Sequence, residues 1–130
     1  MLPVWTGSAT STTDMLKRVE RFSAASSHQY TAAMTELKHC AVSVHTSWLR
    51  GAPDTTLLSL GEFPQALREF DVVAGTGIWS PLHAQIDKIA AATGVLYKPS
   101  GAGGGDFGIA FSQDEARLKS LSTQLETTGF

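Results

Sequence analysis

The feature that most constrains this chain is a helical repeat of apolar residues in its first half. Between positions 30 and 48 an apolar residue recurs every three or four positions, over about five turns: Tyr30, Met34, Leu37, Ala41, Val44 and Trp48. Side chains at this spacing lie on one face of an α-helix. Gly51 and Pro53, two residue types that end helices, follow directly. We therefore predict a long amphipathic helix that ends just before position 51.

A helix is indicated on each side of this segment. The first begins near Ser11, and the spacing turns four apolar residues inward: Met15, Leu16, Val19 and Phe22. The second follows Asp54, which can act as its N-cap. We expect an interruption near Pro64, because a proline inside a helix removes a backbone donor and crowds the preceding turn.

Two more helices are predicted in the second half of the chain. One begins at Ser80-Pro81, since proline is tolerated at the first helical position, and stops at Gly94. The other comes last, ends at Gly129 and turns three leucines inward: Leu118, Leu121 and Leu125.

Three short strands complete the prediction, at positions 2–5, 95–98 and 107–111. In the third, Phe107, Ile109 and Phe111 alternate with small residues, which predicts a strand with one buried face. A loop of seven residues, 99–105, joins the last two strands, so we expect these strands to be antiparallel neighbours. Helices and a small sheet together indicate the α+β class.

Composition narrows the classes of function. With 42% hydrophobic and 17% charged residues, the 130 residues fit one small globular domain. The formal net charge of −2 gives no electrostatic reason to expect nucleic acid or an anionic membrane as a partner. No stretch reaches the roughly 18 apolar residues that a spanning helix needs.

Cysteine and histidine do not indicate a catalytic or metal site. Cys40 is the single cysteine, so it cannot form an internal disulfide, and the cytoplasm is the expected compartment. We interpret it as a small buried hydrophobic residue. The four histidines are too scattered for a metal site and are interpreted as surface or packing residues: His28, His39, His45 and His83.

A glycine cluster between the last two strands is the clearest candidate for a binding site. Glycine fills four of the five positions from 101 to 105, with Lys98 and Ser100 before them and Asp106 after them. Without Cβ atoms, backbone N–H groups can converge into a nest that holds a phosphate. A tight turn between strands explains the same pattern. Two standard nucleotide motifs do not fit, because the Gly-x-Gly-x-x-Gly motif needs glycine at position 106 and the P-loop needs Gly-Lys-Ser/Thr.

The string that starts at Lys98, KPSGAGGGDFGIAF, resembles the third conserved motif of the GHMP kinase superfamily, which includes galactokinase, homoserine kinase, mevalonate kinase and phosphomevalonate kinase. The pattern is nearest to that of the phosphomevalonate kinase branch, where lysine-proline-serine precedes the glycines and aspartate follows them. Trp5-Thr6-Gly7 and Ser11-Thr12-Thr13 resemble the block that opens the family's C-terminal domain. Gly77-Ile78 and Ser80-Pro81-Leu82 resemble the segment before its penultimate helix.

The resemblance implies a single ferredoxin-like C-terminal domain over residues 1–130, with an antiparallel sheet of about three strands packed by four or five helices. The family's last strand, which follows the last helix, is expected to be missing, which leaves a sheet edge open. Phe107 stands where the family usually has a small residue, commonly cysteine, and its ring narrows the expected pocket. The residues implied to line the phosphate or substrate site are Lys98, Ser100, Gly101, Ala102, Gly103, Gly104, Gly105 and Asp106. Ser11 and Thr12 are also assigned to this site, on a weaker match to the block that opens the family's C-terminal domain.

The activity implied for the complete kinase is the ATP-dependent phosphorylation of phosphomevalonate, in the mevalonate pathway of isoprenoid biosynthesis, with ATP and Mg²⁺. The phosphate loop of the family's N-terminal domain, Pro-x-x-x-Gly-Leu-Gly-Ser-Ser, does not occur here. We therefore expect no catalytic residue or cofactor in the isolated chain and negligible activity by itself. The expected partners are a separately encoded N-terminal kinase domain or a second copy in a homodimer, and a phosphorylated small molecule. The alternative is a non-catalytic anion-binding or protein-interaction module that dimerises through the open sheet edge.

Overall fold

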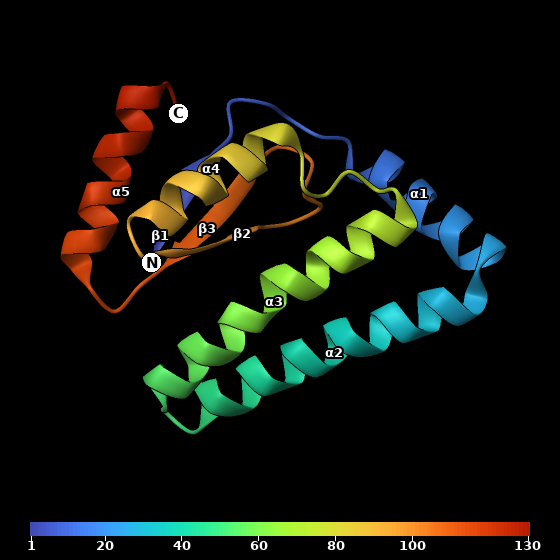
Figure 1. The fold of residues 1–130 in the computed structure, drawn as a ribbon. Helices are drawn as coiled ribbons and strands as arrows, with labels where there is room; N and C mark the ends of the chain where they lie inside the picture. The colour runs from blue at the N-terminus through green and yellow to red at the C-terminus, as the bar shows by residue number, and fades with distance from the viewer. The chain divides into compact units, whose positions relative to one another are not determined.

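The computed structural model describes residues 1–130 and divides them into two compact units. The sheet unit comprises residues 1–11 and 77–130, and the helical unit comprises residues 12–76. The elements of the sheet unit are β1 (Leu2–Trp5), α4 (Pro81–Ala92), β2 (Leu96–Pro99), β3 (Phe107–Phe111) and α5 (Glu115–Thr128) (Figure 1). Those of the helical unit are α1 (Thr12–Ala25), α2 (Ser27–Leu49) and α3 (Pro53–Ala74). Five helices and one small antiparallel sheet confirm the α+β class.

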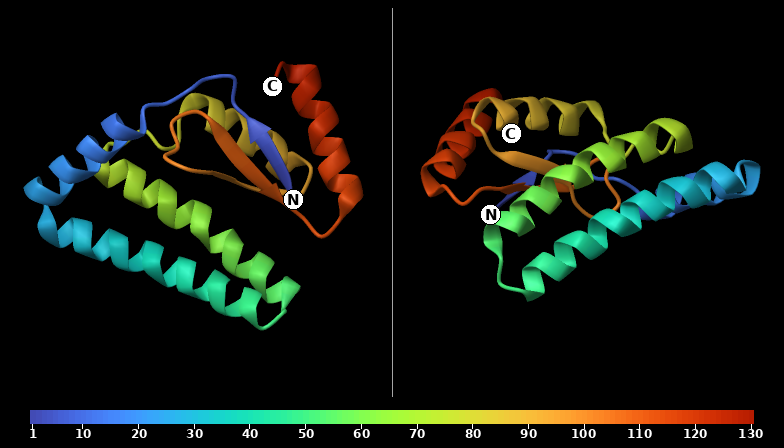
Figure 2. Two further views of the ribbon diagram at one scale, coloured as in Figure 1. Left: turned by 180° about the vertical axis from the view of Figure 1, so that it is seen from behind. Right: turned by 60° about the horizontal axis from the view of Figure 1, so that its bottom comes forward.

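The sheet unit is built on three strands in the order β1-β3-β2, and both pairings are antiparallel. Ala110 on the central strand pairs with Leu2 of β1 on one side and with Tyr97 of β2 on the other. Each edge strand contains a proline, Pro3 or Pro99, and the central strand contains none. This distribution follows from the missing N–H of proline, which cannot donate to the hydrogen-bond ladder of a central strand. Figure 2 shows β1 beside β3, with the second edge of β1 unpaired.

Strand β3 has one buried face, as predicted, and that face carries the small residues instead of the aromatic ones. Gly108 and Ala110 are buried, whereas Phe107 is 49% exposed. Tyr97 explains which face is buried, because a Cβ atom on Gly108 would overlap its hydroxyl and ring. A small central strand therefore makes room for a large ring from β2. The core on this face is completed by Val4, Ile86, Ala90, Val95, Leu121 and Leu125.

Helix α4 begins and ends as its sequence predicts. The Ser80 side chain accepts a hydrogen bond from the His83 amide, and Pro81 takes the first helical position. Gly94 follows the end of the helix with a positive φ of 68°, a conformation that glycine adopts without strain. Helices α4 and α5 contribute the buried residues that cover one face of the sheet.

In the helical unit α2 and α3 run side by side along most of their length, joined by the turn at Gly51 (Figures 1 and 2). The inward face of α2 agrees with the prediction at Tyr30, Leu37 and Val44, which are half-buried, and elsewhere lies one residue earlier than predicted. Cys40 and Ser47 are buried, whereas Trp48 is 72% exposed. Small side chains at the seam allow two helices to approach closely, so contact with α3 decides which face is inside. The prediction that Cys40 is buried is confirmed.

Three further details of the helical unit differ from expectation. Ala52 is the N-cap of α3 and Pro53 its first residue, so Asp54 lies in the first turn instead of capping it. The helix runs unbroken through Pro64, which is buried. One missing hydrogen bond is offset there by the packing of the helix on both sides of the proline. In α1, Leu16 is 57% exposed instead of facing inward.

No helix of the structure combines the length and the apolar character that crossing a membrane requires.

Candidate functional site

Three segments that are far apart in the sequence meet at one end of the sheet unit. They are residues 6–10, residues 77–80 and the glycine loop, which we define as residues 100–106. The Asp106 amide donates to the Ser8 carbonyl over 2.6 Å, and the Gly104 amide donates to the Ile78 carbonyl over 2.8 Å. The Thr6 amide in turn donates to the Asp106 carbonyl over 2.9 Å. The glycine loop is thus held by backbone bonds to both neighbouring segments.

The glycines of the loop are required by space as well as by conformation. Gly103 has a φ of 77°, and a Cβ atom there would lie 2.5 Å from Cγ2 of Ile78. On Gly105 a Cβ atom would lie 2.5 Å from Oγ1 of Thr10 and 2.6 Å from the Ser8 carbonyl oxygen. Real Cβ atoms do not approach other atoms so closely, so each of these positions excludes a side chain. Asp106 is the one non-glycine residue of the chain with a positive φ, at 54°.

The backbone amides of the loop fall into two groups. Those of Ser100, Gly104 and Asp106 donate to carbonyl oxygens of the chain itself, Ser100 to that of Phe107 over 2.9 Å. The amides at positions 101, 102, 103 and 105 make no backbone hydrogen bond. Buried backbone amides are almost always paired, so a set of amides without acceptors is suited to an external anion.

The polar side chains predicted to accompany these amides lie in different settings. Lys98 is half-buried, its ammonium donates to the Pro99 carbonyl over 2.7 Å, and burial lowers its pKa. Ser100 is half-buried at the start of the loop. Ser11 is exposed and is the last of residues 1–11, the N-terminal part of the sheet unit. Thr12 is the first residue of α1 in the helical unit.

Thr10 is a site residue that the sequence analysis missed. Its side chain lies against the glycine loop, where it occupies the space that a Cβ atom on Gly104 or Gly105 would need. No motif singles it out, since Ser8 to Thr13 is a run of small and polar residues of similar type. Only the meeting of the three segments distinguishes it from its neighbours.

His83 is a second residue that the sequence analysis missed, because it was grouped with the scattered histidines. Its side chain is completely buried, with Nδ1 2.8 Å from the Tyr97 hydroxyl and Nε2 2.9 Å from the Gly105 carbonyl oxygen. A carbonyl only accepts, so Nε2 carries the hydrogen and the Tyr97 hydroxyl donates to Nδ1. Its spacing on the buried face of α4, with Ile86 and Ala90, was the available signal.

Burial sets the ionisation of this histidine and of its tyrosine partner. Desolvation lowers the pKa of His83, while its bond to Gly105 and the charge of Asp106 oppose that shift. Desolvation also raises the pKa of Tyr97, with a smaller contribution from Asp87. Both groups are therefore neutral near pH 7, which matches the hydrogen-bond directions inferred from the Gly105 carbonyl.

Phe107 leaves the loop at the start of β3 and pairs with Trp5 of β1. The ring centroids are 4.9 Å apart, and both side chains are well exposed. This pair lies on the face of the sheet opposite to the buried Gly108 and Ala110.

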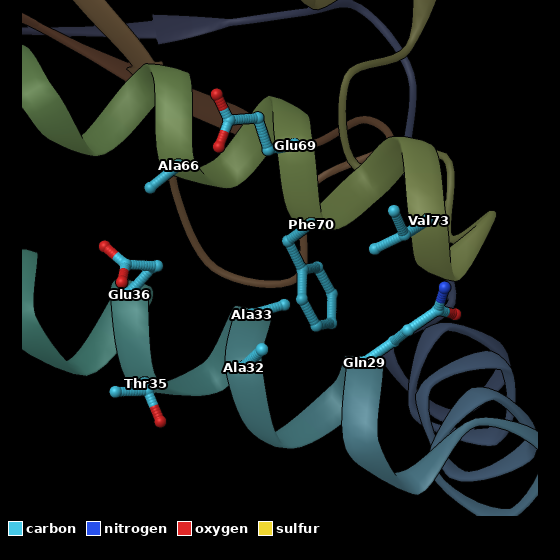
Figure 3. A pocket seen from close by; sticks show the side chains of 9 residues that line it. All are labelled: Gln29, Ala32, Ala33, Thr35, Glu36, Ala66, Glu69, Phe70 and Val73. Carbon is cyan, nitrogen blue, oxygen red and sulfur yellow. The ribbon is translucent and has the colours of Figure 1, made fainter.

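The helical unit holds a separate groove of about 420 Å³ between α2 and α3. Figure 3 shows the ring of Phe70 reaching from α3 toward Ala33 on α2. Glu36 and Glu69 also line the groove. Its lining is mostly apolar and includes no lysine or arginine, so this groove is unsuited to a phosphate.

Comparison with known proteins tests the family resemblance. The chain is 35% identical over 131 residues to a phosphomevalonate kinase of Streptomyces sp. (strain CL190), an alignment that covers 96% of this chain and 34% of the relative. It is also similar to the crystal structure of a Lin0012 protein from Listeria innocua, with a TM-score of 0.90, 27% identity, and coverage of 98% of this chain and 36% of that one. No family model matches the chain.

Both alignments extend through nearly the whole chain, and each spans about a third of the longer protein. The sequence identity agrees with the resemblance carried by the glycine loop and its flanking residues. The comparison therefore supports the resemblance to the GHMP kinase superfamily, through the third of a phosphomevalonate kinase with which the chain aligns.

Proposed function

We propose that this chain is the C-terminal, phosphate-lining domain of a cytoplasmic phosphotransferase similar to phosphomevalonate kinase. The complete enzyme would use ATP and Mg²⁺ to phosphorylate phosphomevalonate in isoprenoid biosynthesis. The observation that carries the proposal is the set of glycine-loop amides without backbone acceptors, in a chain 35% identical to such a kinase.

The residues of the loop fit a phosphate group by their chemistry. The amides at positions 101–103 present consecutive donors, and Ser100 and Lys98 add a hydroxyl and a positive charge beside them. Asp106 is the only carboxylate of the loop. Because Mg²⁺ takes carboxylate and phosphate oxygens, we assign most of its protein ligands to the remainder of the enzyme.

We expect negligible kinase activity from the isolated chain. Phosphoryl transfer depends on positioning and on charge stabilisation supplied from several sides of the reacting group. A domain that lines only one side of the reacting group supplies only part of the positioning and of the charge stabilisation. The purified chain should release no measurable ADP from ATP in the presence of phosphomevalonate, and robust release would refute this expectation.

Phosphate binding is tested by titrating the isotope-labelled chain with phosphomevalonate and following its amide resonances. The amides at positions 101–105 should shift most. Lys98→Met should weaken binding roughly tenfold, as expected for the loss of a charged hydrogen-bond donor. Lys88→Met is the matched control, because it removes the same charge from an exposed position on α4 and should leave the affinity unchanged. Shifts that spare the glycine loop would contradict the proposal.

The proposed macromolecular partner is either a second copy of this chain or a separately encoded N-terminal kinase domain. The second edge of β1 is unpaired, and Trp5 and Phe107 are exposed beside it. Unpaired edges and exposed aromatic groups favour association. Light scattering over a concentration series should reveal a dimer, and a strictly monomeric profile would argue against the second copy.

A non-catalytic module is the second candidate, and the unpaired edge of β1 is the observation that favours it. Such a module would bind an anion or a protein without taking part in phosphoryl transfer. Adding the remaining two thirds of the Streptomyces relative as a separate polypeptide distinguishes the candidates. Recovered kinase activity would support the enzyme domain, and phosphate binding without recovered activity would support the module.

A further inference from the structure

The carbonyl of Gly105 is bonded to a buried side chain of α4. His83 has no exposed surface and Tyr97 is 1% exposed, yet both side chains are polar. His83 Nε2 lies 2.9 Å from the Gly105 oxygen, and Nδ1 lies 2.8 Å from the Tyr97 hydroxyl. The Tyr97 ring is in turn fixed over Gly108, where no side chain fits. A chain of contacts thus leads from β3 through β2 and α4 to the glycine loop.

The effect of this arrangement on the loop follows from the planarity of the peptide bond. The peptide unit between Gly105 and Asp106 is held at both ends, at its oxygen by His83 and at its N–H by the Ser8 carbonyl over 2.6 Å. Because a peptide unit is planar, fixing both groups fixes its orientation. Glycine otherwise allows wide backbone rotation, and glycine fills most of the positions just before this unit.

We propose that His83 is a positioning residue for the glycine loop. Its neutral imidazole has the Nε2–H tautomer that the Gly105 carbonyl requires, and the Tyr97 hydroxyl donates to the remaining ring nitrogen. The imidazole thereby anchors the Gly105 carbonyl and orders the amides at positions 101–103 toward a phosphate group. His83 itself does not touch the phosphate. What the loop binds rests on the proposed function, whereas the tautomer and the ordering of the loop do not.

The surroundings of the imidazole favour this neutral form. Trp79 packs edge-on against the ring, with centroids 6.5 Å apart. Burial favours the neutral imidazole against the charge of Asp106 on the loop, and Asp87 on α4 acts on Tyr97. A buried polar pair that is fully hydrogen-bonded makes a structure more rigid, whereas apolar residues of the same size would fill the space without directing the carbonyl.

Four variants separate positioning from simple core packing. His83→Phe keeps a buried ring and removes both hydrogen bonds, and Tyr97→Phe removes only the hydrogen bond to Nδ1 and leaves the one to Gly105. His83→Gln retains an amide N–H for Gly105 and is the conservative rescue. Ile86→Val is the control, because it trims another completely buried residue of α4 that makes no bond to the loop.

The test uses three measurements on the full chain: the ¹⁵N spectrum of the imidazole, hydrogen exchange of the loop amides, and titration with phosphomevalonate. The wild type and Tyr97→Phe should both show the Nε2–H tautomer near neutral pH, because the Gly105 carbonyl can accept only from a protonated Nε2. His83→Phe should speed exchange of the loop amides and weaken phosphomevalonate binding, each roughly tenfold. His83→Gln should recover most of both losses, and Ile86→Val should change neither.

The outcomes separate this inference from the proposed function. An Nδ1–H tautomer in the wild type, or His83→Phe with unchanged loop exchange, would overturn the positioning role. A wild type that binds no phosphomevalonate, in which His83→Phe still speeds loop exchange, would uphold the positioning role and refute the proposed function. Should His83→Phe fail to fold, the tautomer measurements on wild type and Tyr97→Phe decide the matter, and an Nδ1–H tautomer in either protein would overturn the inference.

Discussion

The two units are equal in length but differ in how closely their side chains are fixed. The sheet unit has a core with completely buried residues and a hydrogen-bonded histidine inside it. The helical unit buries Met15, Phe22 and Phe70 as well as small residues of the seam between α2 and α3, and leaves other large apolar side chains exposed: Trp48, Leu49, Leu58 and Val72. Tight packing is thus found in the unit that carries the glycine loop. A loop made largely of glycine has little stiffness of its own, so its shape has to be imposed by the core beside it.

Replacing a large apolar residue in each unit should give the largest contrast. Ile86 is completely buried in the sheet unit, and Ile86→Ala should lower the free energy of unfolding by about 2–5 kcal/mol through lost burial and a cavity. Leu58 is 74% exposed in the helical unit, and Leu58→Ala should change that free energy by less than about 0.5 kcal/mol. Urea unfolding followed by circular dichroism measures both. Equal losses would show that the two units are packed alike.

Adding one methyl group should act in opposite directions in the two units. Gly108→Ala places a Cβ atom within the Tyr97 side chain and should cost about 1–3 kcal/mol. Gly61 lies within α3 with open space around it, so Gly61→Ala should stabilise the chain by about 0.5–1 kcal/mol through helix propensity. Scanning calorimetry measures both changes in stability, a loss for Gly108→Ala and a gain for Gly61→Ala. A harmless Gly108→Ala would mean that Tyr97 does not occupy the space over β3.

The helix caps should differ more modestly. The Asp114 carboxylate accepts from the amides of Ala116 and Arg117 at the start of α5, and Asp114→Ala should cost about 1 kcal/mol. Ser26 occupies the same position before α2 without a side-chain hydrogen bond, so Ser26→Ala should cost only a few tenths of a kcal/mol. Denaturant unfolding midpoints measure the difference, and a larger loss at Ser26 would reverse the expectation.

The smallest expected effect depends on pH and arises from His83. Burial lowers its pKa in the folded chain, so between that pKa and the ordinary value of about 6.5 the unfolded chain binds more protons. Stability should therefore be complete above about pH 6.5 and fall as the pH drops, by at most about 1 kcal/mol between pH 6.5 and 5.5. His83→Gln should show a shallower dependence than the wild type. Identical pH profiles would mean that His83 is protonated equally in both states.

Element boundaries could be predicted because their signals are local. Gly51, Pro53, Ser80-Pro81 and Gly94 each act through their own backbone, and the structure has helix ends at all of these positions. Pro64 is the exception, since the packing of a long helix outweighs one missing hydrogen bond.

Which face of an element is buried could not be predicted, because that depends on partners distant in the sequence. The alternation in β3 predicts one buried face, and the fit of the Tyr97 ring over Gly108 makes it the face of the small residues. In α2 the contact with α3 selects Cys40 and Ser47 over Trp48. Polarity along one segment carries no information about the shape of what packs against it.

The candidate site likewise contains residues that a local sequence signal identifies and residues that only the folded chain brings to the site. The glycine loop was found from sequence because glycine is rarely so concentrated, and the resemblance gave it a role. Thr10 and His83 were missed, since they belong to the site only where segments from three parts of the chain meet. The roles assigned to Lys98 and Ser100 remain predictions for the binding experiments.

The exclusion of side chains from the glycine loop limits how such a surface can diversify. At Gly103 and Gly105 there is no room for even one extra carbon, so amino-acid replacement cannot alter the wall that they form. A wall of bare backbone recognises negative charge but is indifferent to the rest of a molecule. For the proposed phosphate site, selectivity among phosphorylated compounds would then depend on side chains at its margins, such as those of Thr10 and Phe107.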